Sequence, residues 1–122
     1  MTSIARESAR SEGARAWSNF NQTSTQAFRD SLNFSSITDH GTGKSTITYT
    51  SAFANANYCT TYGVRDGGGE NDTRVLIGSD DASYYTTTNQ RLYCAFHNVS
   101  ANGSGGPNDA TYAFTSSFGD LA

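Results

Sequence analysis

Ala14-Arg-Ala-Trp-Ser-Asn-Phe-Asn-Gln-Thr-Ser-Thr25 and Thr46-Ile-Thr-Tyr-Thr-Ser-Ala-Phe53 are the two stretches that decide the fold. In the second, Ile47 and Tyr49 stand between threonines, so that a bulky side chain occupies every second position. The segment from Gln26 to Phe34 keeps the same period. Successive side chains of a strand point to opposite faces of the sheet, and one bulky residue in two is therefore typical of a half-buried strand. These stretches predict β-structure.

The rest of the chain repeats this spacing. Bulky or β-branched side chains alternate in four later groups: Tyr58, Thr60, Tyr62 and Val64; Val75 and Ile77; Leu92, Cys94 and Phe96; Tyr112 and Phe114. Segments rich in Gly, Asn, Asp and Ser separate the groups, at 40–44, 66–72, 79–82, 88–90 and 101–108. Seven to nine short strands divided in this way predict an all-β fold. We expect a compact antiparallel β-sandwich of about eight strands over residues 14–122, preceded by a short N-terminal arm of residues 1–13.

Length and composition limit the kind of protein. A chain of 122 residues suits one domain. The net charge is -3 and the sequence pI is about 5.1, so the positive charge that nucleic acid requires is missing, and we expect no nucleic-acid partner. No apolar run approaches the ~20 residues that cross a bilayer. Residues 1–13 also lack the apolar centre of a secretory signal. We therefore expect a soluble protein without membrane insertion.

Aromatic side chains have to supply most of the core. The chain has 7 Tyr, 7 Phe and 1 Trp, which together outnumber its large aliphatic residues. Each aromatic side chain buries about 150–250 Å², so a fold with few leucines is feasible. A small domain of this composition buries a low fraction of its surface on its own, and this favours an oligomer.

Cys59 and Cys94 are too few for a disulfide framework. In a chain made in a reducing cytosol we expect both to be buried thiols that form no disulfide. A bridge between them is the alternative, and it requires neighbouring strands with Cα atoms within about 7 Å.

The segment Gly41-Thr-Gly-Lys-Ser-Thr46 resembles the end of a phosphate-binding loop. Such a loop needs a further glycine where this chain has Thr38, and it opens a helix. Here a β-branched strand follows instead. We therefore interpret the segment as a hairpin turn and expect no nucleotide or other cofactor.

Other groups that could carry chemistry give weak signals. The acidic residues of 66–72 do not follow the ligand order of a calcium loop, and a solvated turn is the simpler interpretation. His40 and His97 accompany no recognisable nucleophile motif. A triad assembled across the fold stays open, but we expect no catalytic residue and no metal site, and a protein that is not an enzyme.

Several short motifs together resemble a β-rich module of bacteriophage tail fibres and related virion surface proteins. The matching residues are Ala16, Trp17, Asn19, Phe20, Asn21, Thr23 and Thr25, then Ser35 to Asp39, Gly41 to Gly43, and Ala56 to Tyr58. Gln22 and Ser24 stand where the usual pattern has glycine, and His40 stands where it has asparagine. The resemblance implies a virion protein made in the host cytoplasm, with a non-catalytic role and usually a homotrimeric assembly.

Two functions follow from this resemblance. The first is a tail-fibre-like surface module that mediates attachment to the host cell through a surface glycan or protein. The alternative is a capsid decoration or head-fibre protein anchored by its N-terminal arm, which the lack of a long shaft favours. A glycan-active enzyme is a third and more distant possibility.

A few residues are candidates for these contacts. Tyr84 and Tyr85, flanked by Ser and Thr, and Asn102 in a Gly-rich loop are of the types that form adaptable binding surfaces. The alternative is that Tyr84 packs in the core while Tyr85 covers a sheet face. In the arm, the candidates for docking to other virion proteins are Ile4, Arg6 and Arg10.

Overall fold

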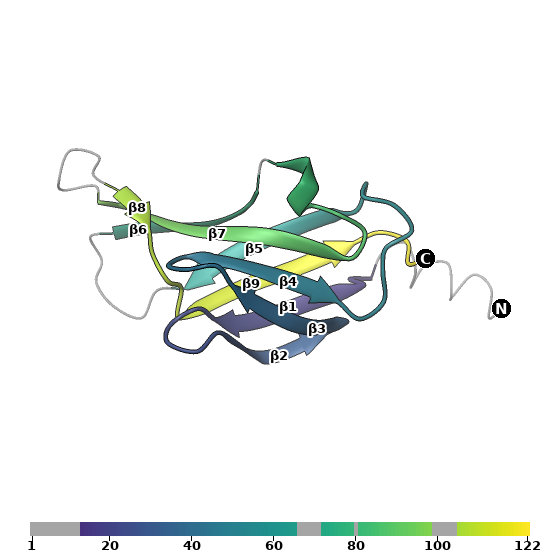
Figure 1. The fold of residues 1–122 in the computed structure, drawn as a ribbon, viewed down its shortest axis with the longest axis horizontal. Coiled ribbons are helices and arrows are strands. Elements are labelled where there is room, and N and C mark those ends of the chain that lie inside the picture. The colour runs from purple at the N-terminus through teal and green to yellow at the C-terminus, as the bar shows by residue number, and fades with distance from the viewer. Residues whose placement is uncertain (1–12, 66–71, 80, 99–104) are drawn as a thin grey trace.

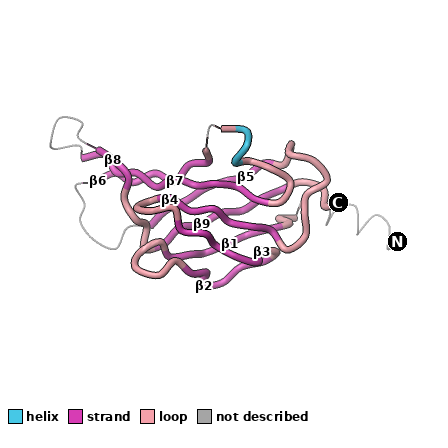
Figure 2. The backbone as a smooth tube through the Cα atoms, viewed as in Figure 1, coloured by secondary structure: helices cyan, strands magenta, loops and turns pink. Residues whose placement is uncertain are grey.

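The computed structural model describes residues 13–65, 72–79, 81–98 and 105–122, which form a sandwich of two antiparallel sheets (Figure 1). The strands are β1 (Ala16–Asn21), β2 (Ala27–Leu32), β3 (Phe34–Asp39), β4 (Lys44–Tyr49), β5 (Cys59–Arg65), β6 (Asp72–Gly78), β7 (Asn89–Asn98), β8 (Gly105–Pro107) and β9 (Tyr112–Phe118). In the described ranges the one helix is the short 3-10 turn η1 (Ala82–Tyr84), seen in Figure 2. The predicted all-β sandwich is confirmed.

Each sheet combines strands that are distant in the sequence. One sheet has the order β2-β1-β9-β5, and the other has the order β3-β4-β7-β6, with β8 added beside β7. The chain passes between the sheets at Asn33, whose φ of 64° lies in the left-handed region. Asparagine tolerates this conformation better than most residues. The Asn33 side chain accepts a hydrogen bond from Ser51 N and donates one to Ser51 O, which holds the crossing in place.

A β-bulge interrupts the alternation that the sequence predicts between Gln26 and Phe34. In the β1–β2 pair, Asp30 lies opposite Asn19 and Phe28 lies opposite Phe20, so Arg29 has no partner on β1. The extra residue shifts the alternation, so that every later side chain of the strand points to the face opposite to the one predicted. Phe28 therefore packs against the core while Leu32, four residues later, is exposed.

The hairpin between β3 and β4 has its turn at 40–43, within the segment 40–44 predicted to be a turn. Asp39 accepts a hydrogen bond from the amide of Gly41, and Lys44 N donates to Gly41 O. Gly43 has a φ of 72°, and a Cβ there would lie 2.4 Å from the carbonyl oxygen of Cys94, so no other residue fits. A strand follows the turn, which confirms that the segment is a hairpin turn and not a phosphate-binding loop.

Aromatic rings fill the space between the sheets, as the composition predicts. Ring centroids 4.1–6.3 Å apart form an unbroken chain through the sandwich: Phe20, Phe28, Phe34, Tyr49, Phe53, Tyr58 and Tyr85. Polar groups among the rings are paired. Gln90 Nε2 donates to Tyr49 Oη at 2.6 Å, and Tyr62 Oη donates to Gln90 Oε1 at 2.8 Å, which links the two sheets across the core.

The inner face of β9 and the first half of the inner face of β1 carry small residues, and Phe20 follows them on β1. Ala113, Thr115 and Ser117 of β9 are buried, and Ala16 and Ser18 of β1 are buried beside them. The rings of the facing sheet occupy the interior, so that small side chains are needed on this side for the sheets to pack at their normal separation. The two aromatic residues predicted for the last strand, Tyr112 and Phe114, therefore lie on its outer face.

Cys59 and Cys94 form no disulfide, as predicted. Cys94 is buried on β7, whereas Cys59 is exposed at the start of β5 in the other sheet, so the prediction of two buried thiols is wrong for Cys59. Tyr58, the preceding residue, points inward and is buried. The alternation of side chains then sends Cys59 outward.

Candidate recognition surface

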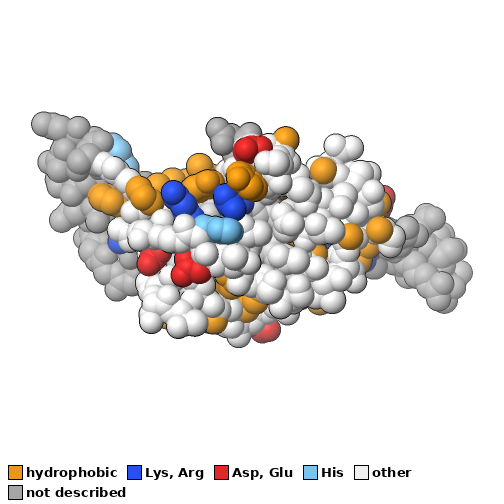
Figure 3. All heavy atoms as spheres, in the orientation of Figure 1, with side chains coloured by type: hydrophobic (Ala, Val, Ile, Leu, Met, Phe, Trp, Pro, Cys, Tyr) orange, Lys and Arg blue, Asp and Glu red, His pale blue; other side chains and the backbone are white. Residues whose placement is uncertain are grey.

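The outer face of the β3-β4-β7-β6 sheet exposes apolar side chains beside positive charge. Val75 and Ile77 of β6 are 48% and 49% exposed, and they lie opposite Ala95 and Tyr93 of β7. Figure 3 shows hydrophobic side chains gathered along this part of the molecule next to basic side chains and a histidine. Exposed aliphatic groups of this size in adjacent positions are a feature of surfaces that make contacts.

Tyr84 stands at one end of this row of exposed apolar side chains, and η1 holds it there. The carboxylate of Asp81 caps the turn by accepting hydrogen bonds from Ser83 N at 2.9 Å and from Ser83 Oγ at 2.6 Å. These two bonds hold the pKa of the Asp81 carboxyl below its ordinary value. The ring of Tyr84 lies over the guanidinium of Arg91, with Cζ 3.8 Å from the ring centroid. A cation over a tyrosine face is attracted by the ring quadrupole.

Arg91 connects Tyr84 to the β3–β4 hairpin. Its Nη2 lies 3.3 Å from His40 Nε2, and its Nε donates to Thr46 Oγ1 at 3.4 Å. Arginine only donates, so His40 Nε2 accepts, which suits a neutral imidazole with its proton on Nδ1. Partial burial, and then the charge of Arg91, lower the pKa of His40 below 6.5, while Asp39 opposes the shift. We call the set His40, Val75, Ile77, Tyr84 and Arg91 the Tyr84–Arg91 surface.

The two candidate tyrosines have different environments. Tyr84 is 36% exposed and does not pack in the core, so that alternative interpretation is wrong for it. Tyr85 stacks on Tyr58 with centroids 4.6 Å apart and donates from its hydroxyl to Tyr58 O at 2.7 Å. Burial raises the pKa of the Tyr85 hydroxyl. Of the pair, Tyr84 has the more exposed side chain, and Tyr85 packs against the core.

Other candidate residues lie outside the described residues. These are Asn102, the docking candidates Ile4, Arg6 and Arg10 of the arm, and residues 66–71 of the acidic loop.

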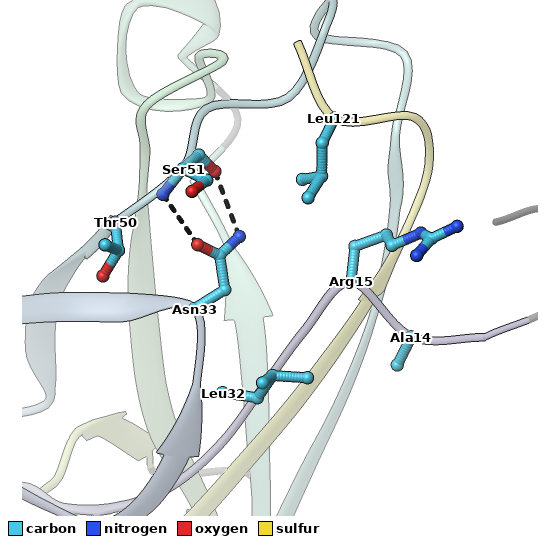
Figure 4. A pocket seen from close by; sticks show the side chains of 7 residues that line it. All are labelled: Ala14, Arg15, Leu32, Asn33, Thr50, Ser51 and Leu121. Atoms are coloured by element: carbon cyan, nitrogen blue, oxygen red, sulfur yellow. Dashed lines mark hydrogen bonds between the residues drawn. The ribbon is translucent and has the colours of Figure 1, made fainter. Parts of the chain in front are cut away.

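A shallow pocket of about 440 Å³ lies where the described chain begins (Figure 4). Its lining comes from four separate segments: Ala14, Arg15, Leu32, Asn33, Thr50, Ser51 and Leu121. Figure 4 shows Leu32 and Leu121 on opposite sides of it, with Asn33 bonded to Ser51 between them. Because Ala14 is the first residue after the predicted arm, the pocket lies at the root of the arm.

The sequence interpretation missed most of the Tyr84–Arg91 surface. One usable signal was Val75-Leu76-Ile77, three consecutive bulky residues in a predicted strand. A strand directs alternate residues to opposite faces, so Leu76 can be buried only if both neighbours point away from the core. The contacts of Arg91 with His40 and Tyr84 carried no such signal, because the pairing of β4 with β7 brings His40 to Arg91 and the η1 turn places Tyr84 against it.

Among the described residues, no three His, Cys, Asp or Glu side chains lie close enough together to hold a metal ion. In the same part of the chain, no helix is long and apolar enough to span a membrane. Comparison with protein-family models, with curated proteins and with solved structures finds no match to this chain.

Proposed function

We propose that this protein is a non-catalytic surface module of a bacteriophage virion that attaches the particle to its host cell. The Tyr84–Arg91 surface is the part proposed to contact the host. A capsid decoration protein, anchored by the arm of residues 1–13, is the alternative from the same class of virion structural proteins.

The positions of the resembling motifs support the first part of this proposal. Phe20 and Tyr58 are buried, and Gly43 occupies a turn that no larger residue fits. These three motif residues are scaffold residues, whereas the motif residue Trp17 is exposed, so most of the similarity to phage fibre modules would concern a shared fold. The side chains that would set the choice of receptor lie elsewhere on the molecule.

The observation that carries the proposed attachment is the stacking of Tyr84 on Arg91 beside two exposed aliphatic residues. An aromatic ring and a guanidinium plane offer flat apolar area together with hydrogen-bond donors, at a low cost in side-chain entropy. Tyrosine and arginine are also the residue types that most often dominate the energy of interfaces. Several copies on one particle would add their weak contacts through a high effective concentration.

The first experiment locates the protein. Quantitative mass spectrometry of purified particles, with the major capsid protein as the internal standard, gives its copy number. A few multiples of three are expected for a tail position, whereas tens to hundreds of copies would support capsid decoration. Absence from the particle would overturn both. For the purified protein, sedimentation should give three times the chain mass of 13.0 kDa if the proposed homotrimer forms.

The second experiment tests the surface. Purified protein, labelled with a fluorophore, is expected to bind host cells, and the pair Tyr84→Ser with Arg91→Gln should weaken that binding by about tenfold or more. Leu121→Ser is the matched control, because Leu121 is similarly exposed but lies at the pocket away from this surface. Equal binding by the double variant and the control would show that host attachment does not use this surface.

A further inference from the structure

We infer that the outer face of the β2-β1-β9-β5 sheet binds an acidic polysaccharide. The proposed site, which we call the Arg29–Arg65 site, consists of Trp17, Arg29, Arg65, Tyr112 and Phe114. It lies on the opposite face of the sandwich from the Tyr84–Arg91 surface, and its binding requires no contribution from that surface.

Two arginines share one tyrosine ring at the centre of the site. The Cζ atom of Arg29 is 4.1 Å from the centroid of Tyr112, and that of Arg65 is 4.8 Å from it. Arg65 lies opposite Tyr112 in the β5–β9 pair, while Arg29 reaches Tyr112 from β2, with β1 between them. The ring thus gathers two guanidinium groups from opposite edges of the sheet.

Arg29 lies at the bulge in β2. Arg29 is the residue left without a partner on β1, so its side chain is not bound to the regular alternation of the strand. Bulges commonly redirect one side chain in this way near functional sites. Without the bulge, Phe28 and Asp30 would lie on the same face of β2 and Arg29 on the opposite face.

The positive charge at this site is not neutralised within the described part of the chain. The contacts recorded there for the Arg29 and Arg65 guanidiniums are those with the Tyr112 ring. Two acids are sequence neighbours of these arginines: Asp30 accepts a hydrogen bond from Ser31 N at 2.9 Å, and Asp66 lies outside the described residues. Two exposed guanidiniums on one ring place two positive charges side by side on the surface of a chain whose net charge is -3, and this pair would attract an anion. The planar fork of arginine matches carboxylate and phosphate groups.

Exposed aromatic rings extend the site along β9. Phe114 lies two residues from Tyr112 on the same face, and Trp17 of β1 lies beside Ser116, the next residue along that face. Phe114 is 36% exposed and Trp17 is 37% exposed. At about 3.3–3.4 Å per residue, the row from Tyr112 to Trp17 spans about 13 Å. Gly63 lies opposite Phe114 and has no side chain to cover the ring.

This combination determines the ligand class. Apolar ring faces can stack against the C–H faces of sugar rings, and the arginines can bind a negative group attached to the same chain. A flat, extended row suits a linear polymer better than a compact ligand. The shared chemistry is an oxyanion on a polysaccharide, either the carboxylate of a uronic acid or a phosphate ester, and the experiment distinguishes the two.

The test is titration calorimetry of the purified full-length protein. Three probes are compared: an oligomer of galacturonic acid, a phosphate-bearing glycan oligomer, and a neutral glucan oligomer of similar length. Binding of one or both acidic probes, weakening as salt is raised, is expected. Whichever acidic probe binds more tightly identifies the oxyanion. No binding of either, or equal binding of the neutral probe, would overturn the inference.

Variants then locate the binding. Arg29→Gln and Arg65→Gln should each raise the Kd about tenfold. Arg29→Lys should recover only part of the lost affinity, because lysine keeps the charge but lacks the planar fork of the guanidinium. Lys44→Gln makes the same charge change on β4 in the other sheet and should leave Kd unchanged. Equal effects of Lys44→Gln and Arg29→Gln would show that the binding depends on net charge alone, and would overturn the site.

A second copy of the chain is the competing occupant of this face. Phe114→Ser is expected to weaken glycan binding without altering the sedimentation of the protein. If it instead dissociates an oligomer and leaves glycan binding intact, the face is an interface between copies, and the inference fails. Because host cells are not used in these measurements, their outcome is independent of the proposed attachment function.

Discussion

The side-chain amide of Gln22 donates a hydrogen bond to Ser45 Oγ at 2.9 Å and so joins the end of β1 to β4 in the other sheet. Gln22 also accepts from Ala110 N at 2.9 Å and donates its backbone N–H to Ala110 O. Ser45 Oγ in turn donates to Gln26 Oε1 at 2.6 Å. Gln22 and Ser45 are both fully buried, so the pairing of their polar groups is essential to the stability of this end of the sandwich.

We expect Gln22→Leu to lower the free energy of unfolding by about 2–4 kcal/mol. The leucine would leave the buried amide of Ala110 and the hydroxyl of Ser45 each short of a partner, and an unsatisfied buried group costs about 1–3 kcal/mol. Urea unfolding followed by tryptophan fluorescence measures the change. Gln26→Leu is the control, since Gln26 is only half-buried and should cost less. A loss below about 0.5 kcal/mol for Gln22→Leu would contradict this account.

Ser24→Gly should stabilise the protein by about 0.5–1 kcal/mol. Ser24 has a φ of 59°, and this left-handed conformation costs a residue other than glycine about 1–2 kcal/mol. Glycine removes that strain, but its greater freedom in the unfolded chain cancels part of the gain. Thermal and urea unfolding give the difference. The same change at Ser35, which lies within β3, should be destabilising. If both variants lose stability, no strain is stored at Ser24.

Stability should fall as the pH rises above about 10. Burial is the main cause that raises the pKa of four tyrosines of the core network: Tyr49, Tyr58, Tyr62 and Tyr85. A raised pKa in the folded state means that the unfolded chain releases these protons first, so the stabilisation is complete below the ordinary value of 10.0 and is lost above it. Tyrosinate absorbance and circular dichroism, followed together, should change in one transition. Ionisation of all the tyrosines without unfolding would contradict the burial.

His40 should titrate below its ordinary pKa of 6.5 and contribute to a loss of stability in acid. Since the folded state holds the neutral imidazole, the unfolded chain binds the proton more readily, and stability falls as the pH drops through this range. An NMR titration of the His40 ring gives its pKa directly. Arg91→Gln removes one of the two causes and should move the pKa upward, whereas Lys44→Gln should not match that shift. An unchanged pKa in Arg91→Gln would rule out the contact between the two residues as a cause.

The strands of the scaffold could be predicted from the sequence, whereas the side chains that meet on the surfaces could not. Period-two spacing predicts strands wherever one face is buried, and β4, with Ile47 and Tyr49 inward, follows it completely. The prediction fails at β2, because the bulge at Arg29 and the left-handed residue Asn33 reset the alternation. Single-residue irregularities of this kind leave no periodic signal, although they decide which side chains face outward.

The sequence alone determined that this chain is a β-sandwich with an aromatic core. Strand spacing and turn residues act on the local backbone, and composition decides which side chains are available to be buried. Only the tertiary structure decided which residues meet on its surfaces. His40 with Arg91, and Arg29 with Arg65 across Tyr112, come from segments that are far apart in the sequence. Their contacts depend on strand order and on the register between strands, which long-range packing of the two sheets fixes and no local pattern records.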